Sequence, residues 1–130
     1  MDSPKLLNPL VLAYQGDVVY ELMVRRRLIE TTRLGVSALH RETVKRVCAH
    51  YQSQAMEILE PMLTQEELEI YKRGRNASSH VPRHADVLEY RRATGFEALF
   101  GYLSLSGQEQ RLEELFEAFW QPPQSPAKSK

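Results

Sequence analysis

A chain of 130 residues is long enough for one domain with a hydrophobic core and too short for two. Its 42% hydrophobic and 26% charged residues are typical of a globular protein and exclude a disordered or fibrous one. Lys and Arg together number 17, as do Asp and Glu, so any electrostatic recognition of nucleic acid must come from local clusters of charge.

The cysteine content and the apolar segments restrict the compartment. The single cysteine, Cys48, excludes an internal disulfide and a cysteine-based zinc site within one chain. No window approaches the roughly 20 apolar residues of a membrane span, and the N-terminal residues lack the apolar core of a signal peptide. We therefore expect a cytoplasmic protein with no membrane partner.

The first predicted element is a long helix over residues 6–29. Apolar residues recur in it at spacings of three and four, and further apolar residues cover nearly the whole circumference. Because a helix that is apolar on most sides is usually packed on most sides, we expect this helix to be a central one.

A second helix is predicted over residues 39–62, with Ser37 as the candidate N-cap and Pro61 as its kink or end. Thr64 and Glu67 then have the form of a capping box, which begins a short helix. We expect that short helix to run to about Arg73, just before a glycine.

Residues 74–85 are predicted to form a loop, after which Asp86 and Glu89 supply a second capping pair. A helix is predicted from there until Gly107, and a final helix covers residues 109–120. The sequence contains no alternating strands, no internal repeat and no Gly-rich phosphate loop. The chain is therefore predicted to be all-α, with about five helices.

Acidic residues interrupt helical segments that otherwise have the composition of a buried core. Asp17 and Glu21 lie one turn apart in the first helix, and Glu97 is the only charged residue between Arg92 and Glu109. A carboxylate removed from water must be paired, hydrogen-bonded or bound to a metal. If Asp17 and Glu97 meet, they form the oxygen-rich site that Mg²⁺ prefers, which supports metal-assisted phosphodiester hydrolysis.

Structural roles compete with this interpretation. Glu21 stands four residues before Arg25, and a surface ion pair would explain it fully. Asp17 has no basic residue three or four positions later, so a structural ion pair would need a partner from elsewhere in the fold. Residue spacing alone favours a structural role for both Asp17 and Glu97 over a catalytic one.

Three segments carry a resemblance to a known family. The stretch LAYQGDVVYE (residues 12–21) resembles the ribonuclease III signature helix, and TGFEALFGYLSL (94–105) resembles that family's second acidic helix. Between them, YKRGRNASSHVPRHADVLEYRRA (71–93) resembles the corresponding segment of the short bacterial Mini-ribonuclease III subgroup. The resemblance covers about residues 6–120.

The resemblance implies a ribonuclease III endonuclease domain over residues 1–121, a homodimeric helical bundle that cuts double-stranded RNA with Mg²⁺ and leaves 5′-phosphate ends. By motif, Asp17 and Glu97 are the catalytic residues and metal ligands. Ala13 and Thr94 stand where classical members carry two further acids, which leaves the number of metal ions open. Glu21 is a further candidate metal ligand.

The Mini subgroup further implies maturation of the 23S ribosomal RNA precursor in bacteria, with a ribosomal protein as an additional partner. The missing acids motivate an alternative, a catalytically silent dimer that binds structured RNA or ribosomal proteins. A third interpretation is a helical protein-interaction module, which would not bind duplex RNA. Residues 122–130, rich in Pro, Ser and Lys, are expected to form a disordered tail.

A basic cluster without acids, over residues 72–85, is the expected RNA-binding surface. The family's usual double-stranded-RNA-binding domain has no counterpart in this sequence, so we expect the catalytic domain itself to hold RNA through phosphates and 2′-hydroxyls. A solvated basic loop is the alternative. The predicted RNA-binding residues are Lys72, Arg73, Arg75, Asn76, Ser78, Arg83 and His84.

Overall fold

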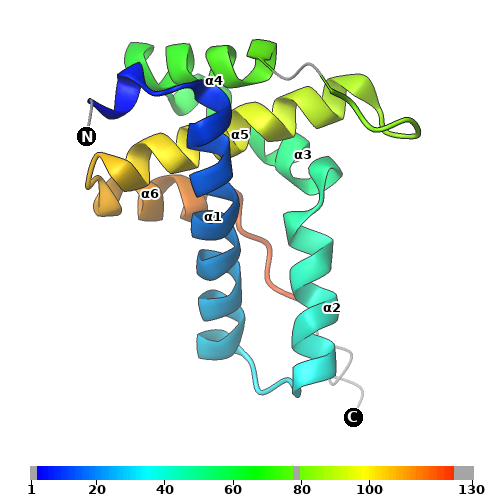
Figure 1. The fold of residues 1–130 in the computed structure, drawn as a ribbon. Helices are drawn as coiled ribbons and strands as arrows, with labels where there is room; N and C mark the ends of the chain where they lie inside the picture. The colour runs from blue at the N-terminus through cyan, green and yellow to red at the C-terminus, as the bar shows by residue number, and fades with distance from the viewer. Residues whose placement is uncertain (1–2, 78–79, 125–130) are drawn as a thin grey trace.

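The structure is a computed structural model that describes residues 3–77 and 80–124 (Figure 1). Within those ranges no strand occurs, and the predicted all-α class is confirmed. Two short 3₁₀ turns, Pro4–Leu6 and Glu60–Met62, accompany the helices. The helices are α1 (Pro9–Thr31), α2 (Val36–Val47), α3 (Ala49–Leu59), α4 (Gln65–Ala77), α5 (Val87–Leu105) and α6 (Glu109–Phe119).

The helix that contacts the most other helices is α5, which packs most extensively on α1, the helix predicted to be a central one. Helix α5 also packs against α3, α4 and α6, and every residue from 98 to 103 is buried. In Figure 1 it passes behind α1 and below α4, while α1 and α2 lie side by side and extend away from the other helices. The apolar residues of α1 lie on nearly all sides of the helix, but other elements cover only part of its surface. One apolar face of α1 is therefore exposed in the single chain.

Aromatic rings fill the space between α1, α5 and α6. The Tyr20 ring meets Phe96 edge-on with centroids 4.8 Å apart, and Phe96 stacks on Phe100 at 4.5 Å. These spacings are the favourable ones for aromatic pairs. The buried Tyr20 hydroxyl donates to the Arg46 carbonyl oxygen at 2.7 Å, so burial leaves it satisfied.

Two glycines bring α1 and α5 into backbone contact. A Cβ atom on Gly16 would lie 1.7 Å from the Glu97 carbonyl oxygen, and one on Gly101 would lie 1.8 Å from the Leu12 carbonyl oxygen. No side chain can therefore separate the helices at this crossing. Since Asp17 follows Gly16 and Glu97 lies one turn before Gly101, the crossing brings the two acidic positions together.

A similar crossing explains why the predicted end of the third helix is wrong. α4 continues through the buried Gly74 to Ala77, so the expected loop begins later than residue 74. A Cβ atom on Gly74 would lie 2.6 Å from the Ala98 Cβ, and one on Gly95 would lie 2.6 Å from the Tyr71 ring. Gly74 allows close helix packing here instead of ending the helix.

The predicted single helix over residues 39–62 is divided into α2 and α3. Cys48 has an extended conformation (φ −77°, ψ 159°), and helix α2 begins with Gly35 as N-cap, so Ser37 lies inside it. The break frees the Arg46 carbonyl oxygen for the buried Tyr20 hydroxyl. A tertiary hydrogen bond thus competes successfully with continuation of the helix.

The predicted capping box is confirmed. The Thr64 amide donates to Glu67 Oε1 at 2.9 Å, and the Glu67 amide donates to Thr64 Oγ1 at 3.2 Å. Asp86 accepts from the Glu89 amide at 2.9 Å as predicted, but the Glu89 carboxylate pairs with His50 on α3 instead of returning to the cap.

The segment after α6 passes between α1 and α2 (Figure 1). The buried Arg46 guanidinium donates to the Gln121 carbonyl oxygen at 2.8 and 3.1 Å and lies over the Trp120 ring. Residues 122–124 are irregular, and the rest of the expected tail lies outside the described residues.

Candidate active site

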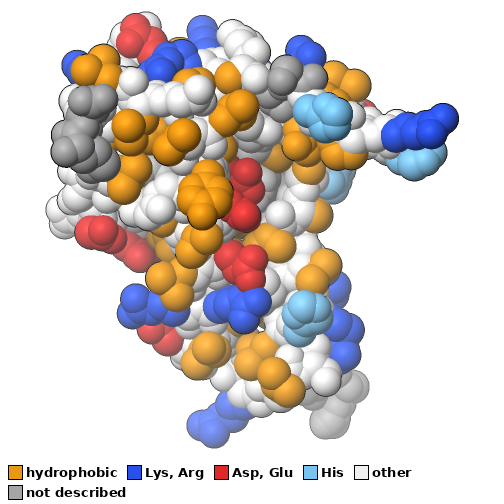
Figure 2. Space-filling model, viewed as in Figure 1, with side chains coloured by type: hydrophobic (Ala, Val, Ile, Leu, Met, Phe, Trp, Pro, Cys, Tyr) orange, Lys and Arg blue, Asp and Glu red, His pale blue; other side chains and the backbone are white. Residues whose placement is uncertain are grey.

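Asp17 on α1 and Glu97 on α5 line the same hollow, whose volume is about 250 Å³. It lies where the two helices diverge from their glycine crossing. The face in Figure 2 has acidic side chains near its middle, bordered by hydrophobic ones. The other lining residues are Leu10, Ala13, Tyr14, His80, Tyr90 and Thr94.

The two acids differ in burial, and the expectation that Asp17 is buried is wrong for the single chain. Asp17 is exposed, because it projects onto the open face of α1, whereas Glu97 is partly buried between α1 and α3. Gln52 on α3 donates from Nε2 to Glu97 Oε2 at 3.3 Å. Glu97 is therefore held in place on the side away from the hollow.

The surroundings of Glu97 favour its neutral form when no cation is bound. Burial raises the pKa of the Glu97 carboxyl to about 7, and the negative charge of Asp17 adds to the rise. Among residues 3–77 and 80–124, no lysine or arginine forms a salt bridge with either acid. In the part of the chain that the structure describes, these two carboxylates therefore have no salt-bridge partner.

Such a pair fits a divalent cation, since Mg²⁺ is commonly held by one or two carboxylates and completed by water and substrate phosphates. The part of the chain that the structure describes contains no group of three or more His, Cys, Asp or Glu residues able to hold a metal. Ala13 and Thr94 line the hollow without adding a carboxylate, and the Thr94 hydroxyl donates to the Tyr90 carbonyl oxygen at 3.0 Å. An Mg²⁺ ion held by Asp17 and Glu97 would therefore take most of its ligands from water and substrate.

Glu21 forms an ion pair with Arg25, which the sequence suggested as the alternative to a role as metal ligand. Its Oε2 lies 2.6 Å from Arg25 Nη2 and accepts from Arg25 Nε at 2.8 Å. Glu21 lines a separate, neighbouring hollow together with Asp17, Val18, Leu22 and Arg25. As a ligand of a metal held between Asp17 and Glu97, Glu21 would have to give up this pair.

The predicted RNA-binding residues lie on two elements. Lys72, Arg73, Arg75 and Asn76 belong to the last two turns of α4, whereas Arg83 and His84 are exposed on the segment before α5. Ser78 lies outside the described residues.

Arg73 makes hydrogen bonds that hold two parts of the fold together. Its guanidinium donates to the carbonyl oxygens of Lys5 at 2.6 Å and Leu7 at 2.9 Å, which fastens the N-terminal segment to α4. Arg73, predicted from the sequence as an RNA-binding residue, therefore already has partners within the fold. Arg75 lies over the Tyr71 ring at 5.7 Å and donates to the Asn76 side chain at 3.2 Å.

The site residues predicted from the sequence did not include His80, Tyr90 or Gln52. Tyr90 lies seven positions before Glu97, a spacing that places both on one face of α5, and this periodicity could have revealed it. Gln52 has no such signal, because its contact with Glu97 depends on how α3 packs against α5.

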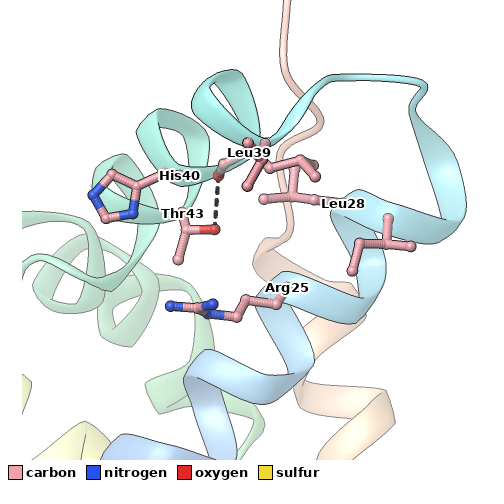
Figure 3. Close-up of a pocket in the computed structure, with 7 residues that line it drawn as sticks. Arg25, Leu28, Leu39, His40 and Thr43 are labelled. Carbon is pink, nitrogen blue, oxygen red and sulfur yellow. Dashed lines mark hydrogen bonds between the residues drawn. The ribbon is translucent and has the colours of Figure 1, made fainter.

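A second hollow, of about 230 Å³, lies between the end of α1 and the start of α2 (Figure 3). Its lining is largely apolar, with Arg25, His40 and Thr43 as polar members. The Thr43 hydroxyl is satisfied by the Leu39 carbonyl oxygen at 2.9 Å. No site residue predicted from the sequence lines this hollow.

Comparison with known proteins identifies the family. The model of the ribonuclease III domain matches residues 10–108. The chain belongs to the ribonuclease III family. Membership of this family makes it an endoribonuclease, and the family generally depends on a divalent metal ion. No helix within the described ranges is both long and apolar enough to cross a membrane.

The similar proteins confirm the resemblance to the Mini subgroup. The chain is 47% identical over 117 residues to the Mini-ribonuclease 3 of Symbiobacterium thermophilum, covering 89% of this chain and 90% of that protein. It is 48% identical over 118 residues to that of Enterococcus faecalis, covering 88% and 89%. A crystal structure of a Fusobacterium nucleatum protein superposes with a TM-score of 0.79 at 28% identity, covering 86% of this chain and 90% of that one.

Proposed function

We propose that the chain is an Mg²⁺-dependent endoribonuclease for double-stranded RNA, with Asp17 and Glu97 as its metal ligands. The observation that carries this proposal is the shared hollow, in which two carboxylates lie close together and the pKa of Glu97 is raised to about 7. Burial is the main cause of the raised pKa, and a cation between the carboxylates would offset the repulsion from Asp17 that adds to it.

The residues of the chain would each have a limited role. Bound Mg²⁺ supplies charge neutralisation at the scissile phosphate and a polarised water for hydrolysis. Asp17 and Glu97 hold the ion, and the Gln52 amide keeps one Glu97 oxygen oriented. Hydrolysis then leaves a 5′-phosphate on one product. The open side of the hollow leaves room for the RNA backbone.

RNA would be held through its phosphates and 2′-hydroxyls. Lys72 on α4 and Arg83 and His84 before α5 are exposed and available for such contacts, together with Arg75 and Asn76. Because these contacts are electrostatic, affinity should fall steeply as salt concentration rises. The proposal extends to the 23S ribosomal RNA precursor as substrate in the bacterial cytoplasm, with a ribosomal protein as an additional partner.

We further propose a homodimer formed through α1. An apolar stripe runs along the open face of α1, with Tyr14 79% exposed and Val18 66% exposed, and the Glu21–Arg25 ion pair lies beside it. Its members are Leu10, Tyr14, Val18, Leu22 and Ile29. One helix face can pair with its own copy about a two-fold axis, which would bury the stripe twice. A patch of this kind is unusual on a monomer.

The dimer is tested by Leu22→Glu, which introduces a charge into the stripe. Light scattering coupled to gel filtration should show a monomer for this variant and a dimer for wild type. Val44→Glu on α2, where the valine is 50% exposed away from the stripe, is the matched control and should remain dimeric. A Leu22→Glu dimer of unchanged stability would refute this interface.

The activity is tested with a labelled RNA duplex and with Asp17→Asn and Glu97→Gln variants whose folding matches wild type. Cleavage by wild type in Mg²⁺ and none in EDTA is expected, and each variant should lose cleavage by at least a hundredfold. Full cleavage by Asp17→Asn at saturating Mg²⁺ would sink the proposed site.

A catalytically silent RNA-binding dimer is the second candidate. It is favoured by Ala13 and Thr94, which supply no carboxylate to the hollow. Duplex binding without cleavage, on native precursor RNA as well as on model duplexes, would favour this candidate over the enzyme.

A further inference from the structure

The hollow around the two acids extends beyond them along α5. Glu97, Thr94 and Tyr90 follow one another at spacings of three and four, so their side chains line one face of the helix. His80 borders the hollow from the segment that precedes α5. The lining therefore adds a phenol and an imidazole to the two carboxylates.

The volume of the hollow exceeds what a cation alone requires. The hollow has a volume of about 250 Å³ and is open to solvent, so part of an RNA backbone can enter it beside a cation. An octahedral Mg²⁺ with two protein ligands binds about four further oxygens, some of which come from the substrate. Space remains at the Tyr90 end for a second group of the RNA backbone.

The polar groups at that end include unused hydrogen-bond donors. The Thr94 hydroxyl is bonded within its own helix. Tyr14 belongs to the apolar stripe of α1. Neither the Tyr90 hydroxyl nor the His80 ring makes a hydrogen bond to any other residue that the structure describes. Both groups can donate, and a tyrosine hydroxyl or imidazole N–H suits a phosphate oxygen.

Distance determines which phosphate these groups can reach. Seven residues of α-helix separate Glu97 from Tyr90, a rise of about 10 Å. This separation allows Tyr90 to contact an RNA group other than the phosphate bound to a cation at Glu97. The next phosphate along the same strand is such a group, and its oxygens accept hydrogen bonds from a phenol or an imidazole N–H.

Resting on the proposed function, we propose that Tyr90 and His80 bind the phosphate adjacent to the scissile phosphate on the cleaved strand. They form a binding subsite that aligns the strand, and the scissile phosphate is thereby positioned over the carboxylates. Neither group is a preferred ligand of Mg²⁺, which takes carboxylate, water and phosphate oxygens, so both remain available to the RNA backbone.

The test compares Tyr90→Phe and His80→Ala with matched controls. Tyr102→Phe removes a hydroxyl from the same helix, where it is bonded to Glu66 outside the hollow, and His50→Ala removes an exposed histidine paired with Glu89. We expect Tyr90→Phe and His80→Ala to lower kcat/KM for an RNA duplex about tenfold with unchanged Tm. The controls should stay within twofold of wild type in kcat/KM.

The contact itself is tested with duplexes that carry a single neutral methylphosphonate beside the scissile phosphate, on one side or the other. A methylphosphonate at the contacted position should lower kcat/KM of wild type by about the same factor as Tyr90→Phe lowers it on the unmodified duplex. Tyr90→Phe acting on the modified duplex should then lose little more kcat/KM than either change alone. Additive losses at both positions would overturn the inference, as would variants that match their controls.

The design separates this inference from the proposed function. If wild type cleaves the duplex and Tyr90→Phe and His80→Ala behave like the controls, only the proposed phosphate subsite is refuted. If wild type binds the duplex without cleaving it, the proposed function fails, and the same cycle measured from duplex Kd still decides whether Tyr90 contacts that phosphate.

Discussion

Replacing Glu97 by glutamine should stabilise the metal-free protein although it abolishes cleavage. The pKa of Glu97 is raised from its ordinary value of 4.5 to about 7, chiefly by burial and then by the charge of Asp17. The folded chain thus binds this proton more tightly than the unfolded chain. Stability from this group is fully present below pH 4.5 and is lost as pH rises to 7.

The size of the effect follows from the shift. At about 1.4 kcal/mol per pKa unit, the rise to about 7 sets an upper limit of about 3 kcal/mol above pH 7. Because Glu97 is partly open to the hollow, water screens its charge, and we expect about 1–2 kcal/mol. Glutamine carries no charge, so Glu97→Gln avoids this loss and still accepts the hydrogen bond from Gln52.

The assay is urea unfolding in EDTA at pH 5, 6, 7 and 8, at one protein concentration, for wild type and Glu97→Gln. The difference in free energy of unfolding should be small at pH 5 and reach its plateau above pH 7. Adding Mg²⁺ at pH 8 should stabilise wild type and reduce the difference, because the ion binds the folded state.

Glu69→Gln, an exposed glutamate on α4, is the control for loss of a surface charge and should show no such pH dependence. A Glu97→Gln variant that is less stable than wild type at pH 8, or whose stability difference does not change with pH, would refute the account of Glu97 as a buried carboxyl with a raised pKa.

Two further predictions concern the packing that positions the site. Gly16→Ala should lower the free energy of unfolding by about 3 kcal/mol or more and suppress cleavage, because its Cβ would lie 1.7 Å from the Glu97 carbonyl oxygen. Calorimetry measures this loss. The control is Gly35→Ala, whose Cβ meets nothing within 4 Å, and it should stay within about 1 kcal/mol of wild type. Burial acts to raise the pKa of Glu67, but its hydrogen bonds from Arg111 and Thr64 outweigh this and lower the pKa. Glu67→Gln should therefore cost about 1–3 kcal/mol at pH 7, and urea unfolding should show this cost disappearing below pH 4.5; an unchanged cost at pH 3 would contradict the ion pair.

Some features of this protein are determined locally, and the sequence by itself determined them. The Thr64–Glu67 capping box and the Asp86 cap were predicted because their hydrogen bonds join residues three positions apart. The all-α class follows in the same way from periodicity. The family was identified from short motifs, and with it came Asp17 and Glu97 as the candidate site residues.

Other features depend on which backbone passes nearby, and only the tertiary structure decided them. Gly74 is a helix end in the sequence and a helix crossing in the fold, because α5 lies against it. Arg73 has the charge of an RNA contact but binds the carbonyl oxygens of the N-terminal segment. The raised pKa of Glu97 likewise requires α1 and α3 to pack around it, since burial and the approach of Asp17 are set by residues distant in sequence.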